Sequence, residues 1–150
     1  MRKSLRRDAF TLIEVLIVVI IMAVLAATII PQFSESTSDA KDSQVKFNLH
    51  TIRSQIEMYK AHHLNEVPSL ANFVTQMTDK SDINGTQTGE LLYGPYVQGS
   101  LPENPFTNTN TIVAVAAEGT EPTAIVAGGA GWQYDESTGD FYPNNSQWFE

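Results

Sequence analysis

A long apolar segment, residues 10–30, lies near the N-terminus of the chain. Only Thr11, Glu14 and Thr28 carry polar side chains within it. At about 1.5 Å per helical residue the segment extends over roughly 31 Å, close to the hydrocarbon thickness of a membrane. A buried strand is excluded, because such strands run for only about 4 to 8 residues. The pattern therefore predicts a transmembrane helix over residues 10–30.

The helical pattern resumes beyond Pro31. We expect this proline to kink the helix and not to end it. Residues 32–44 are polar on nearly every face, but apolar side chains then recur every three or four positions. This spacing predicts an amphipathic helix that continues to about residue 66. The apolar stripe consists of Val45, Leu49, Ile52, Ile56 and Tyr59.

The remainder of the chain has a different character, since every glycine lies at or after Gly85. A short helix is expected over residues 69–77, with Ser69 as its N-cap, and a polar loop over 79–90. Turn residues separate four expected strands, at 111–117, 123–127, 131–135 and 140–142, and a hairpin turn at 136–139. The pattern predicts an α+β fold in which a long helix packs on a small antiparallel sheet.

The residues before the apolar segment are basic. Residues 1–9 contain four bases and one acid and carry +3; since the whole chain carries −8, the rest carries −11. The positive-inside tendency places such a leader in the cytoplasm and the acidic body across the membrane. An acidic body also argues against nucleic acid as a partner, because contacts to phosphates need a basic patch.

Glu14 is an ionisable residue inside the apolar segment, where a charge is costly and needs a reason. A basic leader, the small residue Ala9 and then Phe10-Thr-Leu-Ile-Glu14 resemble the prepilin signal of type IV pilins and of the pseudopilins of type II secretion. The resemblance implies that prepilin peptidase cuts between Ala9, where the family usually has Gly, and Phe10, whose new amine is then methylated. It also implies that Glu14 acts in subunit assembly.

Later segments of the chain follow an order that resembles that in major pseudopilins. These segments are GPYV at 94–97, LPENPF at 101–106 and GWQYDESTGDFYPN at 131–144. The resemblance implies a pilin-like fold with four parts. These are a leader peptide (1–9), a transmembrane helix (10–30), its amphipathic continuation (31–66) and a periplasmic head (67–150). It also implies a single pass through the bacterial cytoplasmic membrane, with the N-terminus inside.

The function that the resemblance implies is structural. Copies of the chain assemble into a pseudopilus fibre that drives protein export in a type II secretion-like system. The implied partners are prepilin peptidase, an inner-membrane assembly platform, a cytoplasmic ATPase and minor pseudopilins.

Two alternatives stay open at this point. The first alternative to a pseudopilin is a type IV pilin of a surface fibre. The second is a soluble exported binding domain that ordinary signal peptidase releases by cutting after Ala26 or Ala27. The absence of cysteine favours the pseudopilin side, because many type IV pilins close a C-terminal disulfide. The mature N-terminus separates a fibre subunit from a soluble domain.

Candidate chemical sites are few. His62 and His63 are adjacent, so on a helix they point about 100° apart and cannot both face one metal ion. Major pseudopilins often bind calcium, and the resemblance implies a Ca²⁺ site near Asp135 and Asp140, with a solvated hairpin as the alternative. No nucleophile motif, His-Glu-x-x-His or Gly-rich phosphate loop is present in the sequence, which predicts that the chain is not an enzyme.

Overall fold

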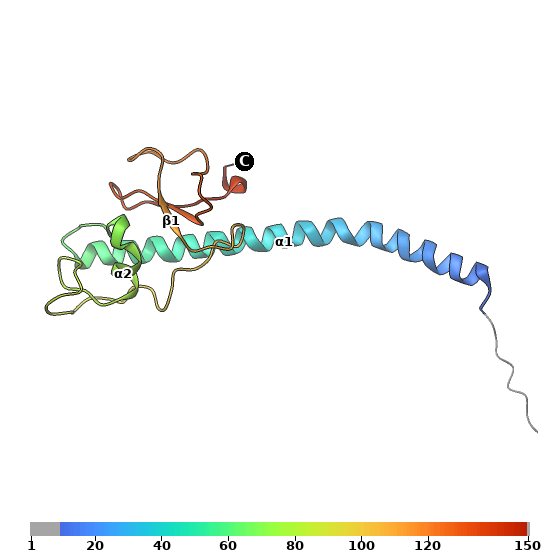
Figure 1. The fold of residues 1–150 in the computed structure, drawn as a ribbon, viewed down its shortest axis with the longest axis horizontal. Helices are drawn as coiled ribbons and strands as arrows, with labels where there is room; N and C mark the ends of the chain where they lie inside the picture. The colour runs from blue at the N-terminus through green and yellow to red at the C-terminus, as the bar shows by residue number, and fades with distance from the viewer. Residues whose placement is uncertain (1–9, 150) are drawn as a thin grey trace, which may run out of the picture. The chain divides into compact units, whose positions relative to one another are not determined.

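The computed structural model describes residues 10–149, and for residues 28–35 it describes the helical backbone alone. The chain divides into two compact units, Met1–Ala40 and Lys41–Glu150. One helix, α1 (Leu12–His62), forms most of the described part of the first unit and begins the second (Figure 1). As predicted, the helix does not end at Pro31.

The described part of the first unit exposes its apolar side chains. Phe10 is 86% exposed, and the large apolar side chains from Ile13 to Leu25 are each exposed by half or more. Among the described residues, no helix contains a stretch that is long and apolar enough to cross a membrane. The transmembrane helix over residues 10–30 stays a prediction.

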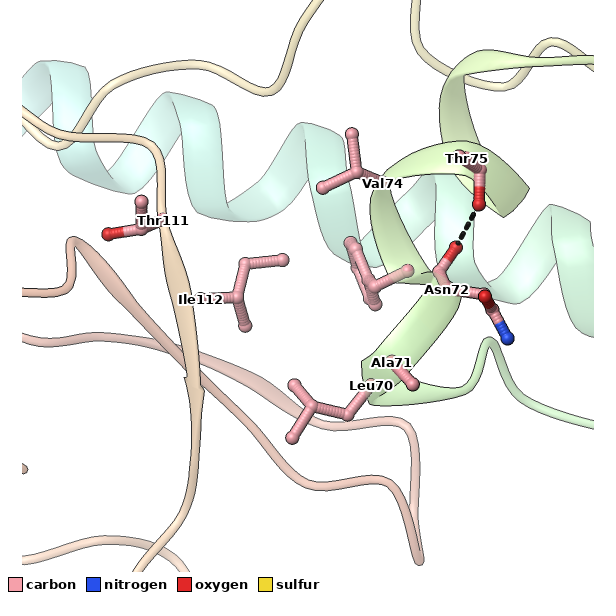
Figure 2. Close-up of a pocket in the computed structure, with 8 residues that line it drawn as sticks. Leu70, Ala71, Asn72, Val74, Thr75, Thr111 and Ile112 are labelled. Atoms are coloured by element: carbon pink, nitrogen blue, oxygen red, sulfur yellow. Dashed lines mark hydrogen bonds between the residues drawn. The ribbon is translucent and has the colours of Figure 1, made fainter.

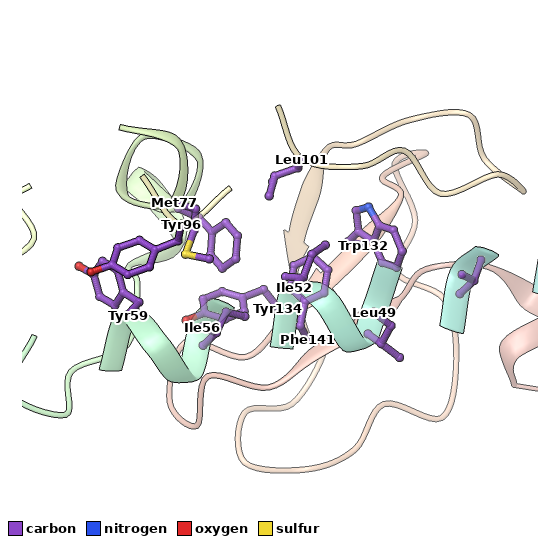
Figure 3. Packing of buried hydrophobic residues seen from close by; sticks show 12 residues of the cluster. Leu49, Ile52, Ile56, Tyr59, Met77, Tyr96, Leu101, Trp132, Tyr134 and Phe141 are labelled. Carbon is purple, nitrogen blue, oxygen red and sulfur yellow. The ribbon is translucent and has the colours of Figure 1, made fainter. Parts of the chain in front are cut away.

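The second unit is built on the C-terminal turns of α1. The five residues of the predicted apolar stripe are all buried, with exposed fractions of 4% or less, which confirms the helical periodicity. They pack against aromatic and apolar side chains from the rest of the unit (Figure 3). These partners include Phe73, Met77, Trp132, Tyr134 and Phe141. Burial of each such large side chain contributes about 1.5 to 3 kcal/mol of transfer free energy.

Two short helical elements cover this core. α1 ends at His62, where Leu64 and Asn65 take left-handed φ angles of 55° and 68°. A 3₁₀ helix, η1 (Leu70–Asn72), and α2 (Phe73–Thr78) then replace the single helix predicted over 69–77. Ser69 stands at the N-cap of η1, as predicted, but its side chain makes no capping hydrogen bond.

The sheet has three short strands, β1 (Ile112–Ala114), β2 (Trp132–Tyr134) and β3 (Phe141–Pro143), in the order β1-β2-β3. β2 and β3 form an antiparallel hairpin, as predicted, but β1 and β2 are parallel. The α+β pilin-like fold is therefore confirmed, while the prediction of a wholly antiparallel sheet is wrong. β1 and α2 lie beside the C-terminal half of α1 (Figure 1).

The strand predicted over 123–127 is not formed, for a physical reason. Buried polar side chains bind this segment where a neighbouring strand would otherwise do so: Gln133 Nε2 donates to the carbonyl of Ala124 at 3.0 Å. Asn144 accepts from the N–H of Val126 and donates to its carbonyl. The segment instead belongs to the crossover between β1 and β2, which a parallel pair of strands requires.

Candidate functional site

The N-terminus of α1 holds a reciprocal pair of hydrogen bonds between Thr11 and Glu14. The Thr11 N–H and hydroxyl donate to Glu14 Oε2 at 2.8 and 2.7 Å. The N–H of Glu14 donates to Thr11 Oγ1 at 3.3 Å. Because Leu12 is the first helical residue, Thr11 stands at the N-cap and Glu14 at the third helical position. The arrangement is a capping box, which satisfies donors that the first helical turn leaves without intrahelical partners.

Phe10 and Glu14 lie on one face of this helix start. Both line a shallow hollow of about 230 Å³, together with Val15, Val18 and Val19. Ala9, the other predicted processing residue, lies outside the described residues. The roles of these three residues stay predictions.

Thr11 is the residue of this site that the sequence analysis missed. The pattern Thr-x-x-Glu before an apolar run is the sequence pattern of a capping box, and it is present at residues 11–14. Glu14 therefore has a local hydrogen-bonding role in addition to the predicted role in assembly. Among the described residues, both hydrogen bonds to its carboxylate reach Oε2, and none reaches Oε1.

The second predicted site is the acidic hairpin between β2 and β3. Asp135 is 1% exposed, and both of its carboxylate oxygens accept hydrogen bonds from the chain itself. Oδ1 accepts from the N–H and hydroxyl of Ser137, at 2.9 and 2.6 Å. Oδ2 accepts from the N–H of Gly119 in the crossover. Asp135 thus binds the hairpin to the crossover, and we call these contacts the Asp135 clamp.

The carboxylate oxygen atoms of this hairpin are not arranged as the ligands of a calcium ion in the described part of the chain. Asp140 is exposed, and its Oδ2 accepts from the hydroxyl of Thr138 at 2.8 Å. Within the part of the chain that the structure describes, no three His, Cys, Asp or Glu side chains are grouped to hold a metal. A calcium site needs about six to eight oxygen ligands, whereas the Asp135 carboxylate is already bound by its own chain. The calcium site stays a prediction that the local donors argue against.

A third group of polar side chains lies where α1 ends. His63 is 1% exposed, and its Nδ1 lies 3.0 Å from the carbonyl of Ile83, which can only accept. Nδ1 therefore donates to this carbonyl, and Nε2 lies within hydrogen-bond distance of the hydroxyls of Tyr96 and Ser81, at 3.1 and 3.3 Å. His62 Nδ1 also lies 3.0 Å from the Tyr96 hydroxyl. These contacts join the end of α1 to the loop that follows α2.

His62 and His63 both contact the Tyr96 hydroxyl, although adjacent helical positions are expected to point their side chains apart. Adjacent helical residues diverge by about 100°, and the N–H of His63 still donates to the carbonyl of Tyr59 at 3.0 Å, as in a helix. Both rings nevertheless lie within hydrogen-bond distance of the same Tyr96 hydroxyl group. Burial, followed by the proximity of Tyr59 and Tyr93, raises the pKa of Tyr96 to about 12. Its hydroxyl consequently keeps its proton at neutral pH, and the predicted structural role fits this network.

Removing the Tyr96 hydroxyl is expected to destabilise the second unit. Tyr96→Phe leaves the buried ring of His63 with fewer hydrogen bonds, which costs about 1 to 2 kcal/mol of unfolding free energy. Tyr93→Phe is the matched control, because the half-buried Tyr93 ring contacts the same two histidines, in a tilted and an edge-on arrangement. Thermal unfolding of the two variants measures the difference, and equal melting temperatures would show that the network contributes nothing.

Comparisons with known proteins add to this geometry. Residues 5–30 match the family model of the prokaryotic N-terminal methylation motif. Type II secretion system core protein G of Pseudomonas aeruginosa is 36% identical over 55 residues, which are 37% of this chain and 39% of the relative. The protein of the same name from Vibrio cholerae is 25% identical over 93% of this chain and 92% of the relative.

A third protein of this name, from Aeromonas hydrophila, is 23% identical over 69% of this chain and 70% of its own length. No solved structure matches the chain.

Proposed function

We propose that this chain is a major pseudopilin, a structural subunit of a pseudopilus in a type II secretion-like system. It is anchored in the cytoplasmic membrane, assembles with copies of itself and drives protein export. Its work is mechanical, and no residue of the chain performs chemistry. The proposal is supported by the N-terminal methylation motif and by the similarity to core protein G over most of the chain.

The observation that carries the proposal is the helix start that follows Ala9. A carboxylate, Glu14, stands one turn into a helix whose large apolar side chains are exposed by half or more as far as Leu25. A helix that exposes apolar side chains in this way needs lipid or other copies of itself to cover them. Both coverings are expected of a subunit that is held in a membrane and then assembles.

The distribution of charge supports the orientation. Residues 1–9 carry +3, whereas the rest of the chain is acidic. Under the positive-inside rule the N-terminus stays in the cytoplasm and the head enters the periplasm. By family resemblance, the partner in the cytoplasm is an ATPase, while the assembly platform and prepilin peptidase lie in the inner membrane. Minor pseudopilins join the same fibre.

Processing at Phe10 tests the proposal. Mass spectrometry of protein extracted from membranes is expected to find a chain that starts at N-methylated Phe10. Ala9→Gly restores the usual residue of the family and is expected to be cut at least as fast as the parent. Ala9→Trp is the opposing variant and is expected to accumulate as uncut precursor, because a bulky side chain precedes the scissile bond.

A chain that starts at Ala27 or Thr28 would contradict the proposal. That start identifies an ordinary signal peptide and a soluble exported domain. Correct processing leaves the surface pilin as the competing function, and imaging separates the two. Deletion of a secretion pseudopilin makes cells retain cargo, whereas deletion of a surface pilin removes the surface fibres and leaves cargo export intact.

A further inference from the structure

An apolar groove opens on the second unit between the η1–α2 segment and β1, with a volume of about 270 Å³ (Figure 2). Leu70 and Val74 line it from the helical side, and Ile112 lines it from β1. Val74 is 50% exposed, so the groove is accessible from outside the molecule. β1 is an edge strand, and in the described part of the chain no further strand closes this side.

Phe47 is an exposed aromatic residue of the same unit. Its side chain is 68% exposed although it stands on α1 between Val45 and Leu49, which are buried. It therefore points away from the core. Three other large apolar side chains of the described part of this unit are exposed by more than half, and all lie outside regular helices: Leu64, Leu92 and Ile125. Phe47 differs because a packed helix holds it in place.

The size of the groove suits one aromatic ring. A protein cavity of about 150 Å³ that is lined by apolar side chains can hold a benzene molecule. The groove is larger, at about 270 Å³, and so has room for a benzyl side chain. Burying such a side chain removes about 150 to 250 Å² of surface from water, which favours the contact.

We propose that Phe47 of one copy inserts into this groove of a neighbouring copy in the fibre. The proposal rests on the proposed function, because it needs copies of the chain to assemble. Phe47 and the groove are different surfaces of one chain, so the contact is heterologous, and its repetition extends an open fibre. The area is far below the roughly 1,000 Å² that a stable interface needs. The contact therefore acts together with contacts between the N-terminal helices.

Cysteine crosslinking tests the contact, because the chain contains no cysteine of its own. Phe47→Cys is combined in one chain with Ala71→Cys on the helical wall of the groove, or with Thr111→Cys on the strand wall. Each double variant is expressed with the parent chain, which supplies the fibre. Mild oxidation is expected to give disulfide-linked multimers from at least one pair, since a disulfide forms where Cα atoms lie within about 7 Å.

Met58→Cys replaces Phe47→Cys in the control chains. Met58 is also exposed on α1, but it lies about 16 Å farther along the helix, so these chains are expected to stay unlinked. Fibres that contain the variants but no links, or equal links from Met58→Cys, would overturn the proposal. Disulfide-linked dimers of chains that carry Phe47→Cys alone would overturn it as well, because they would show that residue 47 of one copy contacts residue 47 on α1 of another copy and not the groove. A parent chain that forms no fibre overturns the proposed function first.

Discussion

Replacing Glu14 with leucine is expected to leave the chain inserted and processed but to lower its incorporation into fibres by about an order of magnitude or more. Before processing, the nitrogen of Phe10 is an amide and carries no charge. Cleavage converts it to an ammonium at the start of the helix, at the same depth as the Glu14 carboxylate. The ammonium of an incoming copy can then pair with Glu14 of a copy already in the fibre, and leucine removes this attraction.

The capping box adds a second reason why Glu14 matters, and the two reasons can be separated. Glutamine at the third helical position also completes a capping box, so Glu14→Gln keeps the hydrogen bonds to Thr11 and removes only the charge. If charge pairing drives docking, Glu14→Gln assembles as poorly as Glu14→Leu. Glu14→Asp keeps the charge on a side chain one methylene shorter and is expected to assemble in part.

The measurement is the amount of each variant in sheared or purified fibres, divided by the amount of processed chain in the membrane. Each variant is expressed as the sole copy. Ile17→Leu is the matched control, because it changes the same exposed helix outside the hollow without altering charge. Parent-level assembly of Glu14→Leu would remove the docking role. Parent-level assembly of Glu14→Gln alone would assign that role to the capping box.

Local patterns explain which parts of the fold the sequence could predict. The stripe from Val45 to Tyr59 was predictable because helical periodicity is a property of one continuous segment. The β2–β3 hairpin was predictable for the same reason, since its turn joins neighbouring strands. The parallel pairing of β1 and β2 was not predictable, because these two strands are joined by a crossover with no regular strand of its own and not by a local turn.

The candidate sites follow the same division. Glu14 was predictable because one carboxylate in an apolar segment is conspicuous, and Thr11 was within reach of the capping-box pattern. The Asp135 clamp was not predictable, because Gly119 is 16 positions away in a loop with no regular structure. The meeting of His62 and His63 at one hydroxyl was not predictable either, because it depends on where the loop after α2 places Tyr96, which is far away in the sequence.

Removing the charge of Asp135 is expected to destabilise the second unit by about 2 to 3 kcal/mol of unfolding free energy. Asp135→Asn replaces one acceptor oxygen with an NH₂ group, which faces either Gly119 or Ser137, and both of these are donors. A buried donor then loses its acceptor. Asp140→Asn is the matched control on the same hairpin, and because Asp140 is exposed we expect a change within about 0.5 kcal/mol.

The pH dependence of stability distinguishes the clamp from a general effect of charge. Burial by itself raises the pKa of Asp135, but the hydrogen bonds from Ser137, Gly119 and Thr138 outweigh it and hold the pKa below the usual 3.8. A group whose pKa is lower in the folded state stabilises the fold above its unfolded value and loses this contribution as pH falls. The stability difference between parent and Asp135→Asn should therefore shrink as the pH is lowered below about 4.

Calcium completes the test of this hairpin, because the clamp and an ion site predict different responses. An ion that binds only the folded chain raises the melting temperature by mass action. If Asp135 serves only its own chain, the full-length protein in detergent melts at the same temperature in calcium and in chelator, and Asp135→Asn melts lower in both. If the ion site exists, calcium raises the melting temperature of the parent, and Asp140→Asn loses that increase together with Asp135→Asn. The second result would overturn the self-contained clamp.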